Sequence, residues 1–215
     1  MSLTYSRGER IADLCIHLIG VPAGVAGAVG LITHGFATGG AATIASLVLY
    51  GAGLVGMLAL SAAYNLTDSP GPKELLRRFD HAAIFTMIAG TYTPFMLLKI
   101  GGGWGIGLLA FVWLTAFAGA GVKLLYPRRL ERVSIALYLA LGWSAVVALR
   151  PIVEALSPPT LLLLAAGGVL YTLGVVFHVS ERLAYQNALW HACVLLAAAC
   201  HYAAVWEAVA PVPVG

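Results

Sequence analysis

Long apolar runs separated by short polar segments dominate the chain. The runs cover about residues 11–33, 41–65, 80–98, 104–122, 133–149, 158–178 and 187–209. Each is close to the roughly 20 apolar residues that a helix needs to cross the hydrocarbon core of a membrane. The pattern therefore predicts an all-α, polytopic membrane protein, a bundle of seven transmembrane helices joined by short loops.

The composition supports a single membrane domain that covers residues 1–215. Hydrophobic residues make up 60% of the 215 residues and charged residues only 10%, whereas soluble domains carry about 25% charged residues. The net charge of +3 is too small, and its placement too patterned, for a nucleic-acid-binding protein. We therefore expect membrane lipids as partners and no nucleic acid.

Positive charge is concentrated in alternate loops. Except for Lys99 and Arg150, every Lys and Arg lies before the first run or in the segments after the second, fourth and sixth runs. Because cytoplasmic loops carry the excess of Lys and Arg, we expect the N-terminus to be cytoplasmic. With seven crossings, the C-terminus then lies outside.

Polar residues occur near the cytoplasmic ends of four spans, and ionisable residues there are functional-site candidates. Three pairs have the i, i+4 spacing that places both side chains on one helix face. These pairs are Asp13 and His17, Ser61 and Asn65, and Asn187 and His191. Further polar candidates are Glu9, Asp80, His81 and His201. Imidazole and carboxylate groups suit a zinc ion, which can polarise a carbonyl and generate hydroxide.

Structural roles explain several of these residues equally well. Asp80 fits the N-cap of the third span, where its carboxylate would accept backbone N–H groups. Asp13 and His17 fit a pair of mutual partners, and His201 fits an interhelical hydrogen bond. His81 fits the headgroup region at the start of the third span.

Several motifs follow one another along the chain. They are Glu9-x3-Asp13-x3-His17, Ser61-x-x-Tyr64, the RRFDH segment at 77–81, the GTYTPF segment at 90–95, and Trp190-His191. Together they resemble the motifs of the hemolysin III family. This family is the bacterial branch of the progestin and adipoQ receptors, within a superfamily that also contains the alkaline ceramidases. The resemblance covers nearly the whole chain and implies a multi-pass protein of the bacterial inner (cell) membrane.

The resemblance also implies a zinc site. Family members hold zinc with three histidines, one ending span two and two opening span seven, while an aspartate holds the metal's water beside a serine. By this resemblance Ser61 and Asp80 match the catalytic positions and His191 one metal position, but Asn65 and Asn187 occupy the other two. An amide oxygen is a poor zinc ligand. The site could bind a harder metal, recruit His17 or His81, or be a metal-free polar network.

Three functions follow from this reading. The first is a sensor or regulator of membrane lipid homeostasis, and the second is a metal-dependent lipid amidase or esterase of ceramidase type. A pore-forming cytolysin ranks third, because no span carries a polar stripe wide enough for a lumen. A retinal protein is excluded, since the only lysines are Lys73, Lys99 and Lys123 and none lies in span seven. The oligomeric state stays open.

Overall fold

The computed structural model describes residues 6–126, 131–180 and 182–210, which are almost entirely helical. The helices are α1 (Arg7–Thr38), α2 (Ala41–Leu66), α3 (Pro70–Phe95), a π-helical turn (Met96–Ile100), α4 (Gly102–Leu125), α5 (Glu131–Gly142), a 3₁₀ helix (Ser144–Ala148), α6 (Leu149–Ala155), α7 (Pro158–Val179) and α8 (Gln186–Val209). In the described residues, seven helical segments are long and apolar enough to cross a membrane. The prediction of an all-α, seven-span bundle is confirmed.

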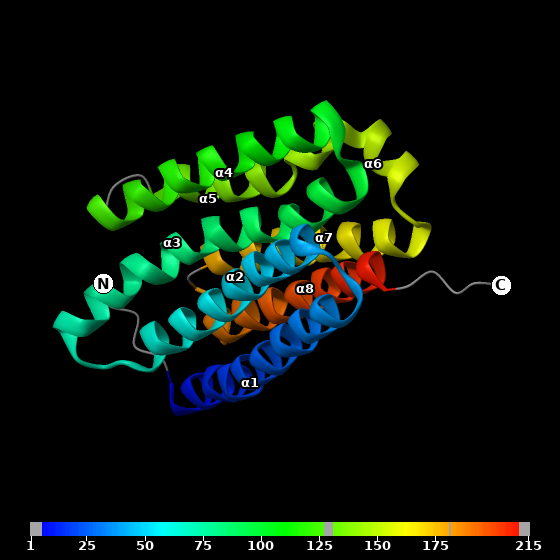
Figure 1. The fold of residues 1–215 in the computed structure, drawn as a ribbon. Helices are drawn as coiled ribbons and strands as arrows, with labels where there is room; N and C mark the ends of the chain where they lie inside the picture. Colours follow the sequence, from blue (N-terminus) through cyan, green and yellow to red (C-terminus); the bar gives the residue numbers. More distant parts are fainter. Residues whose placement is uncertain (1–5, 127–130, 181, 211–215) are drawn as a thin grey trace.

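Helix α3 forms the centre of the bundle (Figure 1). It contacts α2, α4, α5 and α8. Of its most apolar stretch 61% is buried, against 39% or less for the other spans. The helix therefore carries side chains toward both halves of the molecule, with α1, α2, α7 and α8 on one side and α4 and α5 on the other.

The start of α3 differs from the sequence-based expectation. We expected the third span to begin at Asp80, but Ser69 is the N-cap and Pro70 occupies the first turn. Proline suits the first turn of a helix because the missing N–H has no partner there anyway. The charged segment after Pro72 therefore continues the helix. The N-cap interpretation of Asp80 is wrong, since Asp80 lies well inside α3.

The fifth span is interrupted rather than continuous. Its α-helix ends at Gly142, and a 3₁₀ segment leads into α6. The hydroxyl of Tyr92 on α3 accepts a hydrogen bond from the Ala145 N–H at 2.8 Å and donates to the Gly142 carbonyl at 2.9 Å. Backbone groups freed by a break inside a membrane must find partners within the protein. Tyr92 supplies them.

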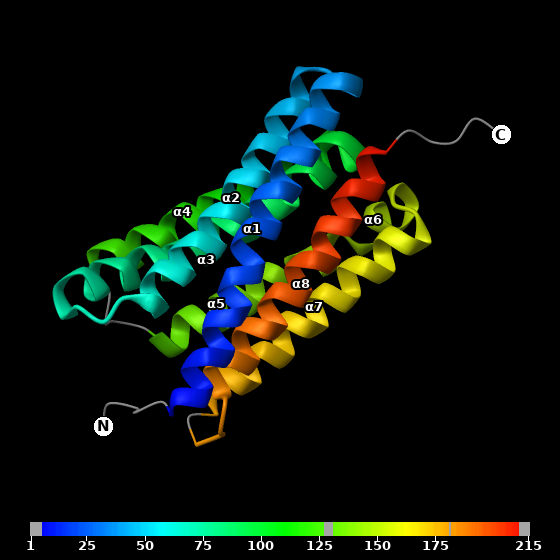
Figure 2. The same cartoon turned by 90° about the horizontal axis from the view of Figure 1, so that it is seen from below.

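Positively charged residues gather at one end of the bundle, which we call the basic end. Helix α1 begins there, and the α2–α3, α4–α5 and α7–α8 connections lie there too, whereas α8 ends at the opposite end (Figures 1 and 2). Within the described residues, Lys99 and Arg150 are the only Lys or Arg on elements at the far end. Arg128 and Arg129, which contributed to the orientation argument, lie outside the described residues. The assignment of the basic end to the cytoplasm stays a prediction.

Candidate functional site

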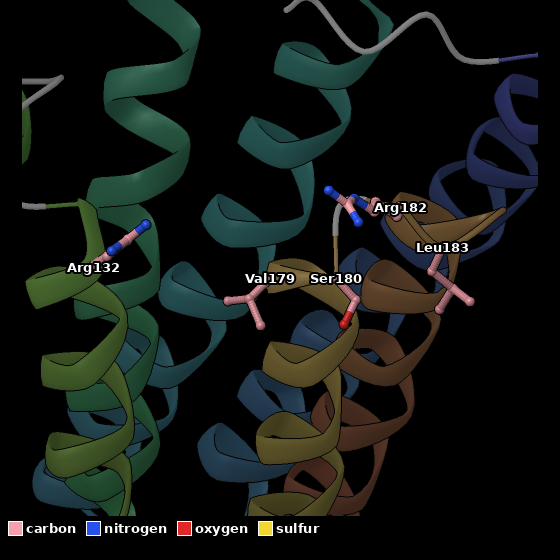
Figure 3. Close-up of a pocket in the computed structure, with 5 residues that line it drawn as sticks. All are labelled: Arg132, Val179, Ser180, Arg182 and Leu183. Carbon is pink, nitrogen blue, oxygen red and sulfur yellow. The ribbon is translucent and has the colours of Figure 1, made fainter.

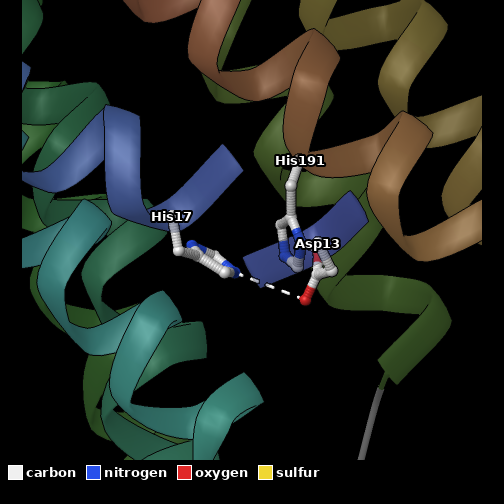
Figure 4. Close-up of side chains that lie close together, drawn as sticks. All are labelled: Asp13, His17 and His191. Carbon is white, nitrogen blue, oxygen red and sulfur yellow. Dashed lines mark hydrogen bonds and ion pairs between the residues drawn. The ribbon is translucent and has the colours of Figure 1, made fainter. Parts of the chain in front are cut away.

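Three buried side chains meet between α1 and α8 (Figure 4). Asp13 Oδ1 lies 2.5 Å from His191 Nδ1, and Asp13 Oδ2 lies 3.6 Å from His17 Nε2. The two imidazole rings have centroids 4.6 Å apart. Asp13, His17 and His191 are only 7%, 5% and 7% exposed. A carboxylate at this depth requires partners, because an isolated buried charge is strongly unfavourable.

The other edge of the His191 ring faces α2. Its Nε2 lies 3.4 Å from Ser61 Oγ and 3.5 Å from Asn65 Nδ2. With Nδ1 donating to Asp13, Nε2 is free to accept a hydrogen bond from the serine hydroxyl or the asparagine amide. A single imidazole thus joins α8 to both α1 and α2.

The two asparagines complete this arrangement. Asn65 donates to the Ser61 carbonyl at 2.9 Å and accepts a hydrogen bond from Asn187 Nδ2 at 3.2 Å. Asp80 on α3 faces the same place, where it interacts with Ser61 and, through charge, with His17. We call this group the polar centre. Its members are Asp13, His17, Ser61, Asn65, Asp80, Asn187 and His191.

The remaining sequence-predicted residues lie elsewhere. Glu9 accepts hydrogen bonds from the backbone N–H groups of Ser6 and Tyr185, so it caps α1 and ties it to the loop before α8. His81 is surrounded by the charges of Lys123, Arg77 and Glu131 and takes no part in the polar centre.

His201 joins two neighbouring helices. Its Nε2 lies 3.3 Å from the Leu164 carbonyl on α7, and its ring packs on Tyr171 with centroids 5.5 Å apart. This contact links α8 to α7 beside Gly167, where an added Cβ atom would collide with the imidazole. The role visible for His201 is therefore helix packing.

The resemblance to the hemolysin III family implies zinc at the positions of Asn65, Asn187 and His191. In this chain these three residues do not fit zinc. Asn65 and Asn187 direct their amides at each other and at a backbone carbonyl, and amides are not among the usual zinc ligands. Only His191 of that set offers a ring nitrogen that can bind a metal. The structure therefore does not support a metal held by residues 65, 187 and 191 together.

A neighbouring set fits a metal better. Asp13, His17 and His191 each offer a ligand atom within 4.8 Å of the others. Two ligands of a tetrahedral zinc ion, with bonds of 2.0–2.1 Å, lie about 3.4 Å apart. Asp13 Oδ2 and His17 Nε2 are 3.6 Å apart, whereas Asp13 Oδ1 and His191 Nδ1 form a hydrogen bond of 2.5 Å and would have to separate to bind the same ion. His17 Nε2 is buried without a hydrogen-bond partner, which is rare for a buried polar atom. This group could hold a metal ion.

The i, i+4 spacing of Asp13 and His17 was visible in the sequence, but their approach to His191 was not. A contact between residues so far apart along the chain depends on how α1 and α8 pack. The sequence signal for the group was the placement of two polar pairs near the same ends of the first and last spans, and recruitment of His17 was one of the alternatives that the sequence left open.

Comparison with known proteins gives consistent results over most of the chain. The family described as "Haemolysin-III related" matches residues 9–202. The chain is 35% identical to "Hemolysin-3" of Bacillus cereus over 187 residues, which cover 87% of this chain and 85% of that protein. It is 34% identical to the "Hemolysin-3 homolog" of Bacillus subtilis (strain 168), with 87% of this chain and 88% of that protein covered.

A human protein is also similar. The "Monocyte to macrophage differentiation factor" of Homo sapiens is 30% identical over 167 residues, which cover 74% of this chain and 68% of that protein. The family match includes every member of the polar centre and all seven spans except the last residues of α8 and the first of α1. The chain therefore belongs to the haemolysin-III-related family of multi-pass membrane proteins.

Proposed function

We propose that this protein is a sensor or regulator of membrane lipid homeostasis, in which the polar centre sets how α1 packs against α2 and α8. The observation that carries the proposal is the buried Asp13–His191 contact, through which one imidazole joins three helices. Polar networks of this kind are strong when fully satisfied and costly when partly broken, because the surroundings have a low dielectric. Such a network favours a few distinct packings of the helices over a continuous range of packings.

We further infer that Asp13, His17 and His191 bind a zinc ion. Zinc bound there would supply a positive charge and a Lewis acid with an open coordination position. The protein's own contribution is to hold one carboxylate and two neutral imidazoles at the required spacing. Because each coordinating atom must be deprotonated, the proton on His191 Nδ1 would have to move to Nε2 of the same ring. Zinc affinity should fall as the pH is lowered, because protons then compete with zinc for the two imidazoles.

The metal content of the detergent-purified protein tests the zinc inference. We expect about one zinc per chain in the wild type, a loss of most of it in His17→Gln, and retention in His201→Gln. The control is matched, since His201 is also a partly buried histidine but lies outside the polar centre. A zinc-free wild type beside a zinc-filled Asn65→His/Asn187→His double variant would show that the centre is a metal-free network.

The lipid composition of cells tests the regulatory role separately. We expect a strain that lacks the protein to adjust its membrane lipids abnormally after a temperature shift. The wild-type gene and Asp68→Ala should restore the normal composition, whereas Asp13→Ala should not. An unchanged composition in the deletion strain would contradict the regulatory role whether or not zinc is bound.

Lipid hydrolysis is the second candidate function, favoured by the chemistry of the buried group. Catalytic zinc sites use three protein ligands and keep one position open, as Asp13, His17 and His191 would. Ser61 would support the oxyanion and Asp80 would orient the attacking water and accept its proton. Hydrolysis of a ceramide or ester lipid by the purified protein, lost in Asp80→Asn with zinc retained, would favour this function over the first.

Pore formation, suggested by the names of the bacterial relatives, ranks third. The described ionisable groups of the spans gather mainly near their ends, rather than along one helix face. We expect no dye leakage from liposomes that contain the purified protein at neutral pH. Rapid leakage that depends on protein concentration would reverse this ranking.

A further inference from the structure

A second cluster of charged groups lies at the basic end, away from the polar centre. Between the beginning of α5 and the end of α7 there is a cavity of about 450 Å³ that is wide open to the surface (Figure 3), and it is lined by Arg132, Val179, Ser180, Arg182 and Leu183. Its volume is within the range of ligand sites, about 300–1,000 Å³. We propose that this cavity binds the anionic headgroup of a membrane phospholipid.

The two arginines provide the charge. Neither Arg132 nor Arg182 has an ion-pair or hydrogen-bond partner among residues 6–126, 131–180 and 182–210. A guanidinium group offers a planar set of donors that matches the oxygens of a phosphate. Each of the two groups that line the cavity is therefore suited to the oxygens of a phosphate ester.

Among the described residues, two acidic side chains near the beginning of α5 are already engaged. Arg77 lies 2.9 Å from Glu131 Oε1 and 3.2 Å from Glu74 Oε1, so it pairs with both of these carboxylates. Lys123 at the end of α4 is 2% exposed and lies within the electrostatic range of Arg77 and Glu131. Among these described groups the balance is positive, and it attracts an anion.

The helix ends and Ser180 contribute little by comparison. The positive end of the α5 dipole favours an anion, while the negative end of α7 opposes it. Ser180 donates its hydroxyl hydrogen to the Val176 carbonyl at 2.6 Å, so it has no proton left for a phosphate. Recognition therefore depends on Arg132 and Arg182.

The apolar part of the cavity indicates a lipid rather than free phosphate. Val179 and Leu183 are 57% and 44% exposed beside the two arginines. A soluble anion makes no use of such side chains, whereas the glycerol and first acyl carbons of a phospholipid do. Basic pockets between transmembrane helices at the cytoplasmic side are suited to anionic headgroups.

This site does not depend on the polar centre, which is built from α1, α2, α3 and α8. A lipid site at this place is additional to the proposed function. If no lipid binds here, the proposed function is unaffected. His191→Gln should leave lipid binding unchanged, and the loss of lipid binding should leave the zinc content unchanged. The two sets of measurements are therefore separable.

The test is a titration of the full-length protein in neutral detergent, followed by native mass spectrometry. The probes are short-chain phosphatidylglycerol, short-chain phosphatidylcholine and inorganic phosphate. We expect phosphatidylglycerol to bind best, and Arg132→Gln/Arg182→Gln to weaken it about tenfold, or ~1.4 kcal/mol. High salt should weaken binding in the wild type, since exposed charges are screened.

The matched control is Arg7→Gln/Arg10→Gln, which removes the same charge from the basic end but leaves the cavity intact. It should keep the wild-type affinity within about twofold. The affinity of Arg132→Lys/Arg182→Lys should lie between those of the wild type and the Arg132→Gln/Arg182→Gln variant, because lysine keeps the charge but lacks the planar set of donors. Elution profile and thermal stability show that each variant is folded. Three results would overturn the proposal. They are equal weakening of phosphatidylglycerol binding in the two glutamine double variants, binding of phosphatidylcholine as strong as that of phosphatidylglycerol, and competition by inorganic phosphate as strong as competition by the lipid.

Discussion

Both ring nitrogens of His191 lie near polar partners on other helices. An imidazole can donate a hydrogen bond from one nitrogen and accept one at the other, and this explains how His191 connects α8 to two neighbouring helices. A glutamine could reach one of these partners, and an alanine neither. The ring lies 2.5 Å from Asp13 on one side and 3.4 Å from Ser61 on the other. Removing one partner of a buried charged pair costs more than the pair itself contributes, because the other group stays buried alone.

The first prediction concerns Asp13 and compares two aspartates. Asp13→Ala should lower the free energy of unfolding by about 3 kcal/mol, because His17 and His191 lose their carboxylate. Asp68→Ala should change it by less than about 1 kcal/mol, since its contact with Arg10 is exposed and 4.0 Å long. Thermal unfolding in detergent measures both. Equal midpoints for the two variants would contradict a structural role for the polar centre.

At the scale of the helices, the interruption of the fifth span depends on one side chain from another helix. Tyr92 on α3 provides a hydroxyl that accepts from Ala145 N–H and Ser144 Oγ and donates to a carbonyl at the end of α5. In a lipid environment the break has no water to satisfy these groups. The kink is therefore held by α3.

The second prediction concerns the effect of removing the Tyr92 hydroxyl. Tyr92→Phe should destabilise the protein by about 1–3 kcal/mol, because at least one buried backbone group loses its partner. Tyr202→Phe is the control, since its hydroxyl makes no hydrogen bond within the described residues. Thermal unfolding in detergent gives the comparison. If the two variants unfold at the same temperature, the break is stabilised by something other than Tyr92.

Close packing of α2 against α3 is the second feature at this scale. A Cβ atom added at Gly90 would lie 3.2 Å from the Leu49 carbonyl oxygen, whereas one added at Gly107 on α4 meets nothing within 4 Å. The neighbour at Gly90 is backbone, which cannot move aside as a flexible side chain can. Only glycine fits this approach without a shift of α2.

The third prediction uses these two glycines. Gly90→Ala should lower the free energy of unfolding by about 1–3 kcal/mol through overpacking. Gly107→Ala should be neutral or stabilising by up to about 1 kcal/mol, because alanine favours the helix. Thermal unfolding of the two variants in the same detergent checks this. A Gly90→Ala protein as stable as the wild type would show that α2 and α3 can separate at little cost.

For the whole molecule, the arrangement of charges predicts one orientation in the membrane. The described Lys and Arg residues gather at the end where α1 begins, and the other end has Lys99 and Arg150. The structure shows this segregation but contains no membrane, so the sidedness comes from the positive-inside rule alone.

Fusion proteins in bacterial cells test this fourth prediction. Alkaline phosphatase joined after the last residue should be active, because it folds only outside the cytoplasm. Green fluorescent protein at the same place should be dark, and it should fluoresce when it is joined to the N-terminus. The reverse pattern would place the basic end outside.

The bundle itself could be predicted from the sequence because membrane burial acts on each segment separately. A run of about 20 apolar residues must form a helix in lipid whatever its neighbours are, so seven runs indicate seven spans. The span ends were less predictable. The apolar run predicts a third span that begins at Asp80, but Pro70 and Pro72 occupy the first turn of α3 and Asp80 lies inside the helix.

The polar centre could be predicted from the sequence only in part. Helical spacing alone relates Asp13 to His17 and Asn187 to His191. Hydropathy and spacing describe one helix at a time and do not predict contacts between helices. The resemblance implied a metal site at residues 65, 187 and 191.

By itself, then, the sequence determined the helical class, the number of spans and the segregation of charge, because these follow from local apolar length and local charge. Only the tertiary structure decided that Asp13 and His17 meet His191, that Asn65 and Asn187 face each other, and that Arg132 and Arg182 share a cavity. The physical reason is that side-chain chemistry between helices depends on their rotation and separation, which are set by packing.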